Sequence, residues 1–287
     1  MDISIVIPCK NEAKGLSVIL PDLVKTYPNA EIIISDDASE DETAEVIQQF
    51  NVQHKVWHIT RPYSLGNGGA IKAGARAATG DVIVFMDGDG QHRPEDIAAL
   101  LSKLEEGYDM VVGARDADGQ ASLPRRMANA FYNRFSSWMV GHCIMDLTSG
   151  FRAVRREKFI EFIHLLPNTF SYPTTCTMAF FRAGYPVGYV PVRVEKRIGK
   201  SHIRILRDGL RFLIIIFKIG TLFSPLKIFL PVAAFMFACG CGWYAYTFAT
   251  IGRFTNMSAL LFTGSVMVFL LGLISEQITT LMYKGDW

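Results

Sequence analysis

The chain has 287 residues, of which 50% are hydrophobic, 12% aromatic and 20% charged, and its formal net charge is +2. This composition excludes an intrinsically disordered polymer and a collagen-like repeat. The mean hydropathy of +0.22 is high for a soluble protein. Segments that cross a membrane therefore have to be sought along the chain.

The five cysteines are scattered and odd in number, and they form neither a CxxC pair nor a Cys/His metal spacing. A disulfide framework and a zinc site are therefore not expected, and a reducing compartment fits. The first eight residues form a short strand-like run broken by Pro8, without a basic region or a long apolar stretch. We expect no secretory signal, which leaves the N-terminal part in the cytosol.

Up to about residue 115, short apolar and β-branched runs alternate with amphipathic stretches. The apolar runs predict buried parallel strands, and the stretches between them have the spacing of helices that cover a sheet. This alternation predicts an α/β sandwich of the nucleotide-binding kind. The expected strands are 3–7, 31–35, 56–60, 81–87 and 109–115, and the expected helices are 14–26, 41–50, 69–78 and 95–106.

From residue 116 to 200 the alternation is looser. We expect one domain over residues 1–200, of which this half completes the sheet. The pattern predicts a polar loop at 116–124, helices at 125–140 and 173–183, and strands at 150–155 and 186–194.

A basic segment follows this domain. Residues 193–218 carry eight Lys or Arg against Glu195 and Asp208, an excess of six positive charges. The basic residues of 203–219 fall on one side of a helix whose other side is Ile, Leu and Phe, so a helix in the membrane interface is expected within 201–222. A helix packed on the first domain with a solvated charged face is the alternative.

Two uncharged stretches near the C-terminus are long enough to cross a bilayer. No charged residue occurs at 228–252 or at 254–275, and at ~1.5 Å per residue each stretch spans a hydrocarbon core of ~30 Å. We expect a transmembrane hairpin over 223–287, with spans at about 228–251 and 255–279. By the positive-inside rule, the basic segment places the first domain on the cytoplasmic face of the plasma membrane, or of the inner membrane in a prokaryote.

Small residues recur every fourth position in the first of these spans, at Ala234, Ala238 and Gly242. Such a stripe permits close contact between helices. The contact would lie either within the hairpin or between protomers, so a homo-oligomer is possible.

The run FMDGDGQHRPED at 85–96 carries the strongest chemical signal. An apolar strand ends there in Asp87 and Asp89, and Gln91 follows before a helix that Pro94 introduces. At the carboxyl end of a parallel strand, where such sheets bind ligands, these side chains offer oxygen donors suited to Mg²⁺ or Mn²⁺. We therefore expect a divalent metal here that neutralises a diphosphate, although an isolated Asp-Gly-Asp is more often a simple turn.

Three further segments are expected at strand ends of the same sheet: IPCKNE (7–12), SDDASEDET (35–43) and RPYSLGNGGAIKAG (61–74). Asp36 or Asp37 would bind a ribose hydroxyl or a base N–H, and the glycine-rich turn opens a helix whose N-terminal amides favour phosphate. The glycine spacing misses the Rossmann fingerprint, and the run Gly199-Lys200-Ser201 misses Walker A. These misses argue against a dinucleotide oxidoreductase and an ATPase.

Taken together, these motifs resemble those of the family 2 glycosyltransferases of GT-A fold. The similarity is to the branch of dolichyl-phosphate mannose synthase and the bacterial polyprenyl-phosphate glycosyltransferases. It covers about residues 1–205 in the family's order, and an interfacial helix with a membrane hairpin follows as in that branch. The motifs that carry it are VIPCKNE, SDDASEDET, GNGGAIKAGARAATGD, FMDGDGQHRPED, GAR (113–115), DLTSGFRAV (146–154) and RIGKS (197–201).

The resemblance implies transfer of a sugar from a nucleotide diphosphate donor, a UDP- or GDP-sugar, to a polyprenyl phosphate, with inversion at the anomeric carbon. It implies a Mg²⁺ or Mn²⁺ cofactor held by Asp87, Asp89 and Gln91. The partners would be the donor, the lipid phosphate and the membrane, and we expect no nucleic acid among them.

The resemblance also assigns the remaining site residues. Pro8, Glu12 and Asp37, with Asp36 as its interchangeable neighbour, would line the nucleotide. Arg115 and Arg125 match the acceptor-phosphate arginines, and Arg126 is an equal candidate for the second place. The basic loop near the diphosphate would be formed by Arg197, Lys200 and Ser201, although His202 stands where many members have Lys.

A phosphate acceptor also explains what the sequence lacks. No QxxRW motif of processive polysaccharide synthases occurs. A phosphate monoester, with a second pKa near ~6, is already a charged nucleophile at neutral pH, so it needs no general base. Asp89, Arg115 and Arg125 would then act by alignment and charge neutralisation. The alternatives are a transferase of this fold that acts on a membrane lipid hydroxyl, and a catalytically silent nucleotide-sugar-binding scaffold.

Overall fold

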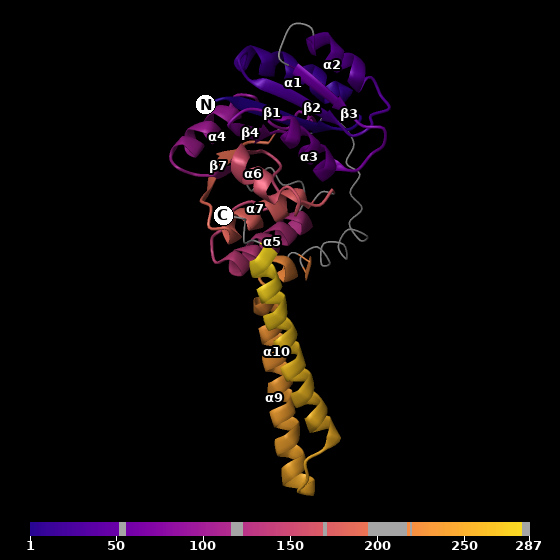
Figure 1. The fold of residues 1–287 in the computed structure, drawn as a ribbon, viewed down its shortest axis with the longest axis vertical. Coiled ribbons are helices and arrows are strands. Elements are labelled where there is room, and N and C mark those ends of the chain that lie inside the picture. The colour runs from indigo at the N-terminus through magenta and orange to yellow at the C-terminus, as the bar shows by residue number, and fades with distance from the viewer. Residues whose placement is uncertain (52–55, 116–122, 169–170, 195–216, 219, 283–287) are drawn as a thin grey trace. The chain divides into compact units, whose positions relative to one another are not determined.

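In the computed structural model the chain divides into two compact units, residues 1–203 and 204–287 (Figure 1). The structure describes residues 1–51, 56–115, 123–168, 171–194, 217–218 and 220–282. The first unit contains the sheet, and the second contains two long helices. Most of the interfacial helix expected within 201–222, namely 201–216 and 219, lies outside the described residues.

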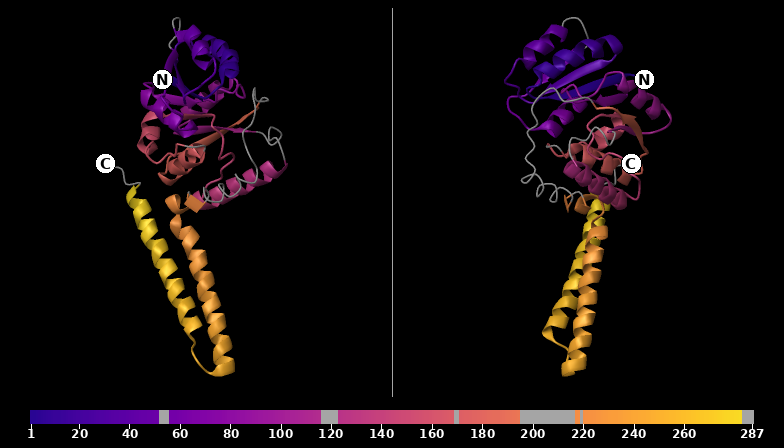
Figure 2. Two further views of the ribbon diagram at one scale, coloured as in Figure 1. Left: turned by 90° about the vertical axis from the view of Figure 1, so that its right-hand side faces the viewer. Right: turned by 180° about the vertical axis from the view of Figure 1, so that it is seen from behind.

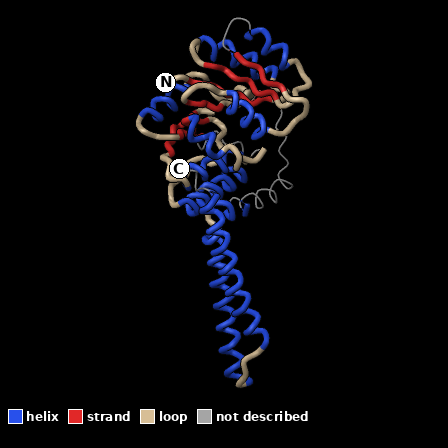
Figure 3. Tube along the Cα trace, in the orientation of Figure 1, coloured by secondary structure: helices blue, strands red, loops and turns tan. Residues whose placement is uncertain are grey.

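The first unit is built on a seven-stranded sheet with the order β3-β2-β1-β4-β6-β5-β7 (Figure 3). β6 pairs antiparallel with β4 and β5, and every other neighbouring pair is parallel. The strands expected from the apolar runs all form within a few residues of the predicted bounds. They are β1 Ile3–Cys9, β2 Glu31–Asp36, β3 Val56–Thr60, β4 Val82–Phe85, β5 Met110–Arg115, β6 Arg152–Arg155 and β7 Val187–Val192.

Helices cover both faces of this sheet (Figure 2). Because successive residues of a strand point to opposite faces, Ile5 and Ile7 of β1 bury against the helices of one face, together with Leu16 and Leu20. α3 lies on the other face, and a Cβ at its Gly74 would come within 2.4 Å of a methyl carbon of Val6. The helices are α1 Ala13–Thr26, α2 Thr43–Asn51, α3 Asn67–Ala77, α4 Asp96–Glu105, α5 Leu123–Val140, α6 Arg156–Phe162 and α7 Tyr172–Arg182.

α6 is a helix that the sequence pattern did not predict. It has seven residues and begins directly after β6, without an intervening turn. Its apolar side chains Phe159 and Phe162 are buried, and the Phe159 ring centroid lies 4.8 Å from that of Phe85 in β4. Two turns are too short to establish a helical period, so the sequence pattern does not reveal this helix.

The second unit is an antiparallel hairpin of α9 Pro225–Ile251 and α10 Asn256–Met282. Both helices are long and apolar enough to cross a membrane. Gly252 ends α9 in the left-handed conformation, φ 69°, which favours glycine. Near the open end of the hairpin, the Leu226 N–H donates to Glu276 Oε2 at 3.2 Å.

The contact between the two helices does not use the predicted small-residue stripe. Ala234, Ala238 and Gly242 are exposed within the hairpin, and a Cβ added at Gly242 would meet nothing within 4 Å. The buried positions of α9 are instead Pro225, Ala233, Gly240 and Thr247, the last three at intervals of seven residues. The Ser265 hydroxyl of α10 donates to the Ala233 carbonyl at 2.8 Å, which fixes the register of the pair.

Candidate active site

The loops that follow β1, β2 and β4 meet at one edge of the sheet. Cys9 at the end of β1 pairs with Asp36 at the end of β2, and Phe85 at the end of β4 pairs with Val6 of β1. The carboxyl ends of these parallel strands therefore lie side by side, which is where open α/β sheets bind ligands. Pro8 is buried in β1 opposite Ser35.

The loops after β1 and β2 are bound to each other. The Glu40 N–H donates to Asn11 Oδ1 at 2.8 Å, and the Asn11 N–H donates to Ser39 Oγ at 2.9 Å. The backbone N–H of Glu12 donates to Thr43 Oγ1 at 3.2 Å. These hydrogen bonds hold the Glu12 segment against the start of α2. Two residues with side chains, Asn11 and Ala38, adopt positive φ values of 56° and 61°, which is sparsely populated for alanine in particular.

Asp37 is buried, and its carboxylate binds the loop that precedes α3. It accepts hydrogen bonds from the Ser64 hydroxyl at 2.5 Å and from the N–H groups of Leu65 and Gly66 at 2.9 and 2.7 Å. Burial alone would raise the pKa of Asp37, but these bonds and the charge of Arg61, 3.7 Å away, hold it below its usual value. The ionised carboxylate therefore organises the glycine-rich turn.

Asp36 also binds its own loop. It accepts hydrogen bonds from the Ser39 N–H at 2.9 Å and the Ser39 hydroxyl at 2.6 Å, and His58 Nε2 lies 3.5 Å from its other oxygen. The nucleotide-binding roles expected of Asp36 and Asp37 stay predictions. The contacts of both carboxylates explain how two strand-end loops keep their shape.

The loop after β4 carries Asp87, Asp89 and Gln91. Asp89 is buried, and its Oδ1 accepts a hydrogen bond from the Gln91 N–H at 3.1 Å. A Cβ at Gly15 of α1 would lie 2.1 Å from the Gly88 carbonyl oxygen, so the helix approaches this loop only because residue 15 is glycine. The loop is therefore closely packed from one side.

The donor set of this loop fits a hard divalent cation. No cluster of three His, Cys, Asp or Glu side chains that could hold a metal occurs among the residues that the structure describes. Mg²⁺, however, is commonly bound by one or two carboxylates together with substrate phosphates and water. Two carboxylates and a carboxamide on one short loop match that mode, in which a diphosphate supplies the remaining oxygen ligands.

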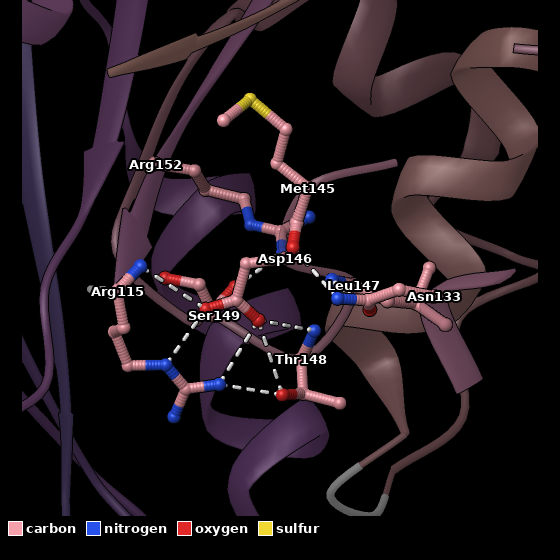
Figure 4. A network of polar contacts seen from close by, with 8 residues as sticks. All are labelled: Arg115, Asn133, Met145, Asp146, Leu147, Thr148, Ser149 and Arg152. Carbon is pink, nitrogen blue, oxygen red and sulfur yellow. Dashed lines mark hydrogen bonds and ion pairs between the residues drawn. The ribbon is translucent and has the colours of Figure 1, made fainter. Parts of the chain in front are cut away.

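Arg115, at the end of β5, forms a two-point ion pair with Asp146 (Figure 4). Its Nε lies 2.8 Å from Asp146 Oδ2, and one terminal nitrogen donates to Asp146 Oδ1 at 3.0 Å and to the Thr148 hydroxyl at 2.5 Å. Burial alone would lower the pKa of Arg115, but these bonds and the charges of Asp146 and Asp87 hold it above its usual value. β4 and β5 both pair antiparallel with β6, so the carboxyl ends of β4 and β5 lie at the same edge of the sheet, with the carboxylate loop after β4 and Arg115 at the end of β5.

The same pairing keeps Asp146 ionised. Burial would raise the pKa of its carboxyl, but the hydrogen bonds and charge of Arg115 outweigh burial and lower it. Asn133 of α5 holds the neighbouring backbone, because its amide donates to the Met145 carbonyl at 2.6 Å and its Oδ1 accepts from the Leu147 N–H at 3.1 Å. Loop 145–148 is therefore bound to α5 through Asn133 and to the end of β5 through Arg115.

Arg152 is a fully buried arginine that sequence reasoning did not single out. Its guanidinium donates to the Pro173 carbonyl and the Thr177 hydroxyl, both at 3.1 Å, and to the Ser149 carbonyl. It also lies over the Tyr172 ring, 5.9 Å from the centroid. Arg152 therefore fastens the loop that contains Asp146 to α7. The arginine was visible in the DLTSGFRAV motif, but only its burial reveals this role.

His92 packs between the loop that carries Asp89 and the segment that leads into β6. Its ring stacks on that of Phe151, with centroids 4.5 Å apart and planes inclined by 13°. Burial lowers the pKa of His92 to about 4, so the ring is neutral at physiological pH. It therefore acts as an uncharged spacer between the Asp89 loop and the strand that carries Arg152.

The remaining predicted residues are only partly covered. Arg125 and Arg126 lie in the first turn of α5, and their side chains are outside the described part of the chain. The basic loop of Arg197, Lys200 and Ser201 lies in the segment 195–216, which the description also leaves out. The structure thus brings together Asp87, Asp89, Gln91 and Arg115 from the predicted set, next to the loops of Asp36, Asp37 and Glu12.

Comparisons with known proteins match both units. The model of the family "Glycosyl transferase family 2" matches residues 4–163, and that of the "GtrB C-terminal hairpin" matches residues 224–281. The chain is 34% identical over 190 residues to an undecaprenyl-phosphate 4-deoxy-4-formamido-L-arabinose transferase of Photorhabdus laumondii. That match covers 60% of this chain and 57% of the relative, so the chain spans little more than half of its length.

Two further matches cover a larger share of the matched protein. A dolichyl-phosphate hexose transferase of Haloferax volcanii is 26% identical over 210 residues, covering 72% of this chain and 89% of the relative. The crystal structure of glucosyl-3-phosphoglycerate synthase from Mycobacterium tuberculosis, in complex with Mn²⁺, UDP and phosphoglyceric acid, superposes with a TM-score of 0.56. It is 20% identical and covers 73% of each chain, which shows the fold. The GT-A-like fold expected from the motifs is therefore confirmed, and the chain belongs to glycosyl transferase family 2.

Proposed function

We propose that this protein transfers a sugar from a nucleotide diphosphate donor to a polyprenyl phosphate in the membrane, with inversion at the anomeric carbon. The observation that supports the proposal is that the loop of Asp87 and Asp89 and the Arg115 side chain follow two strands, β4 and β5, that end at the same edge of the sheet. A negative loop suits a metal-bound diphosphate, and a fixed guanidinium suits a second phosphate. The relatives that act on undecaprenyl phosphate and dolichyl phosphate support the same acceptor class.

On the donor side, Asp87, Asp89 and Gln91 would hold a divalent cation, as the Mn²⁺ and UDP bound to the mycobacterial synthase suggest. When bound, such an ion neutralises the charge of the leaving nucleotide diphosphate. Pro8, Glu12 and Asp36 or Asp37 would line the nucleotide. Arg197, Lys200 and Ser201 would add positive charge near the diphosphate.

On the acceptor side, Arg115 and Arg125, or Arg126 in place of Arg125, would bind the lipid phosphate. The bonds to Asp146 and Thr148 fix the plane of the Arg115 guanidinium, so its remaining N–H donors approach a phosphate in one orientation. A phosphate oxygen would attack the anomeric carbon, and the nucleotide diphosphate would leave from the opposite face. No proton has to be removed from the nucleophile.

A phosphate acceptor makes fewer demands on the site than a hydroxyl acceptor does. A hydroxyl nucleophile requires a general base, and the best base has a pKa near the working pH. Both carboxylate oxygens of Asp146 bind Arg115, so this carboxylate serves to orient the guanidinium. An acceptor that arrives already ionised avoids this requirement.

We also propose that the first unit faces the cytoplasm. The two apolar helices and the hairpin match support integration in a membrane, and the basic segment 193–218 supports the orientation. We propose the boundaries 1–200, 201–222 and 223–287 for the transferase domain, the interfacial helix and the hairpin. A maleimide probe on a cysteine placed at Lys284 should react only after the cytoplasmic side is opened, and labelling from outside would refute this topology.

The function is tested by incubating the full chain in detergent with a panel of UDP- and GDP-sugars and a short polyprenyl phosphate. We expect one donor to give a glycosylated lipid phosphate with inverted configuration. The matched control is the free polyprenol of the same length, which should give no product. Equal use of the polyprenol would reject the base-free mechanism, and no product with any donor would reject the transferase assignment.

A further inference from the structure

Gly150 lies directly against the carboxylate of Asp87, although the two residues are far apart in the chain. It belongs to the segment between α5 and β6 that also contains Asp146. A Cβ added at Gly150 would lie 3.0 Å from Asp87 Oδ2 and 3.4 Å from Oδ1. The shorter distance is closer than most Cβ contacts in proteins. A side chain at residue 150 would therefore require either this carboxylate or the backbone of the segment to move.

The backbone conformation of Gly150 does not itself require glycine. The described glycines that adopt a positive φ are Gly66, Gly90, Gly107, Gly141, Gly184 and Gly252. Gly150 is not one of them, so an alanine could adopt its φ without strain. What excludes a side chain is the Asp87 carboxylate, together with the Tyr172 hydroxyl, which would lie 3.3 Å from the same Cβ.

The backbone of this segment is held in place around Gly150. The carbonyl groups of residues 149, 150 and 151 accept hydrogen bonds from β6, α7 and β5, respectively. The donors are the Arg152 guanidinium, the Tyr172 hydroxyl at 3.4 Å and the Gly113 N–H at 2.9 Å. Because three consecutive carbonyl groups are bound, the segment has little freedom to move away from Asp87. A methyl group at residue 150 would therefore displace the carboxylate.

We propose that Gly150 is a positioning residue for Asp87, because the absence of a side chain at residue 150 leaves the space in which the Asp87 carboxylate lies. The inference rests on the proposed function, in which Asp87, Asp89 and Gln91 hold a divalent cation. It adds a residue outside that set on which the placement of one metal ligand depends.

The same segment also supports the arginine of the site. Asp146 and Thr148 bind the Arg115 guanidinium (Figure 4). Gly150 lies two residues after Thr148 and contacts the other side of the site through Asp87. The bonds to Arg115 are thus made by residues other than Gly150. A side chain at residue 150 should therefore weaken metal binding more than it weakens binding of the acceptor.

The contact is tested without metal, by a double-mutant cycle on the full chain in detergent and excess EDTA. Gly150→Ala should lower the melting temperature. Adding Asp87→Ala should recover most of this loss, because the new methyl group then takes the space of the carboxylate. Additive shifts of the two substitutions would overturn the proposal. If Gly150→Ala alone does not fold, the double variant should fold, and failure of both would also overturn it.

Gly188→Ala is the matched control. Gly188 lies in β7 of the same sheet, its φ is not positive, and a Cβ there would lie 3.1 Å from the Tyr108 ring, so the substitution is similarly crowded. It pairs with Val111 near the start of β5, whereas the candidate site lies at the other end of that strand. The melting-temperature shifts of Gly188→Ala and Asp87→Ala should therefore be additive.

A second measurement follows Mn²⁺ binding by electron paramagnetic resonance in the presence of UDP or GDP. Gly150→Ala should weaken Mn²⁺ binding about tenfold, and Gly188→Ala should leave it unchanged. The KM for polyprenyl phosphate should stay near the wild-type value in both variants. Wild-type Mn²⁺ affinity in Gly150→Ala would overturn the positioning role. A wild-type protein that binds no Mn²⁺ would reject the metal site of the proposed function, whereas the metal-free cycle would still decide whether Gly150 places Asp87.

Discussion

The two sides of the candidate site hold their charges in opposite ways. On the side of β1, β2 and β4, buried carboxylates such as Asp37 are surrounded by backbone N–H and hydroxyl donors of the adjacent loops. On the side of β5 and β6, the charged groups are the half-buried Arg115, held by a carboxylate, and the fully buried Arg152, held by carbonyl oxygens. One side is thus preorganised around negative charge and the other around positive charge. The negative side suits a diphosphate bound through a divalent cation, and the positive side suits a phosphate bound directly.

The largest effect should come from the carboxylate side. Asp89→Ala should lower kcat/KM roughly 100- to 1,000-fold, because a metal that neutralises the leaving diphosphate contributes several kcal/mol. Excess EDTA should have a similar effect on the wild type. Glu95→Ala, an exposed carboxylate six residues further on, is the control and should keep full activity. Full turnover by Asp89→Ala would remove the metal from the account.

The next effect tests the arginine side through stability. Arg152→Met should lower the free energy of unfolding by roughly 2–4 kcal/mol, because buried carbonyls of Ser149 and Pro173 lose a donor. Arg155→Met is the control on the same strand, since Arg155 is partly exposed and pairs with Asp109 at 3.3 Å. That surface pair should contribute less than ~1 kcal/mol. Equal thermal and denaturant midpoints for the two variants would show that Arg152 is not a structural anchor.

A smaller effect should depend on pH. The folded pKa of Asp146 is below its unfolded value, so its pairing stabilises the protein above about pH 4 and this contribution is lost as the pH falls through the folded pKa. At pH 7, Asp146→Asn should lower the free energy of unfolding by about 1.5–3 kcal/mol. The difference between variant and wild type should shrink steadily from pH 4 to pH 3. A difference that stays constant over this range would mean that the charge of Asp146 contributes nothing.

Much of the fold was predictable because the short apolar runs of β1 to β5 alternate with amphipathic stretches of helical spacing. The motifs at their ends predicted which edge of the sheet carries the candidate site. Side-chain partners were not predictable. The bonds from Ser64 and Gly66 to Asp37 depend on how two loops pack, and the burial of Arg152 depends on α7, which lies more than twenty residues away in the chain.

The hairpin illustrates the same limit. Its two helices follow from the uncharged stretches, whose length and composition are local properties. The face on which the two helices meet depends on the other helix, because Ala233 and Gly240 contact side chains of α10 such as Ser265 and Phe262. The stripe of small residues at every fourth position is therefore not the contact within the hairpin, and a contact between protomers stays a prediction.

The most direct test of the central claim, that the carboxylates bind the donor and the arginines bind the acceptor, compares Asp89→Ala with Arg115→Ala and Arg125→Ala. Donor affinity is measured by calorimetry, and transfer kinetics are measured against varied polyprenyl phosphate, with Arg115→Lys as the variant that keeps the charge. We predict that loss of either arginine raises the acceptor KM about 10- to 150-fold, equivalent to ~1.5–3 kcal/mol, with donor affinity nearly unchanged. Lysine should rescue only part of this, because it lacks the guanidinium fork. Arginine variants that lose donor binding and keep the wild-type acceptor KM would contradict the account.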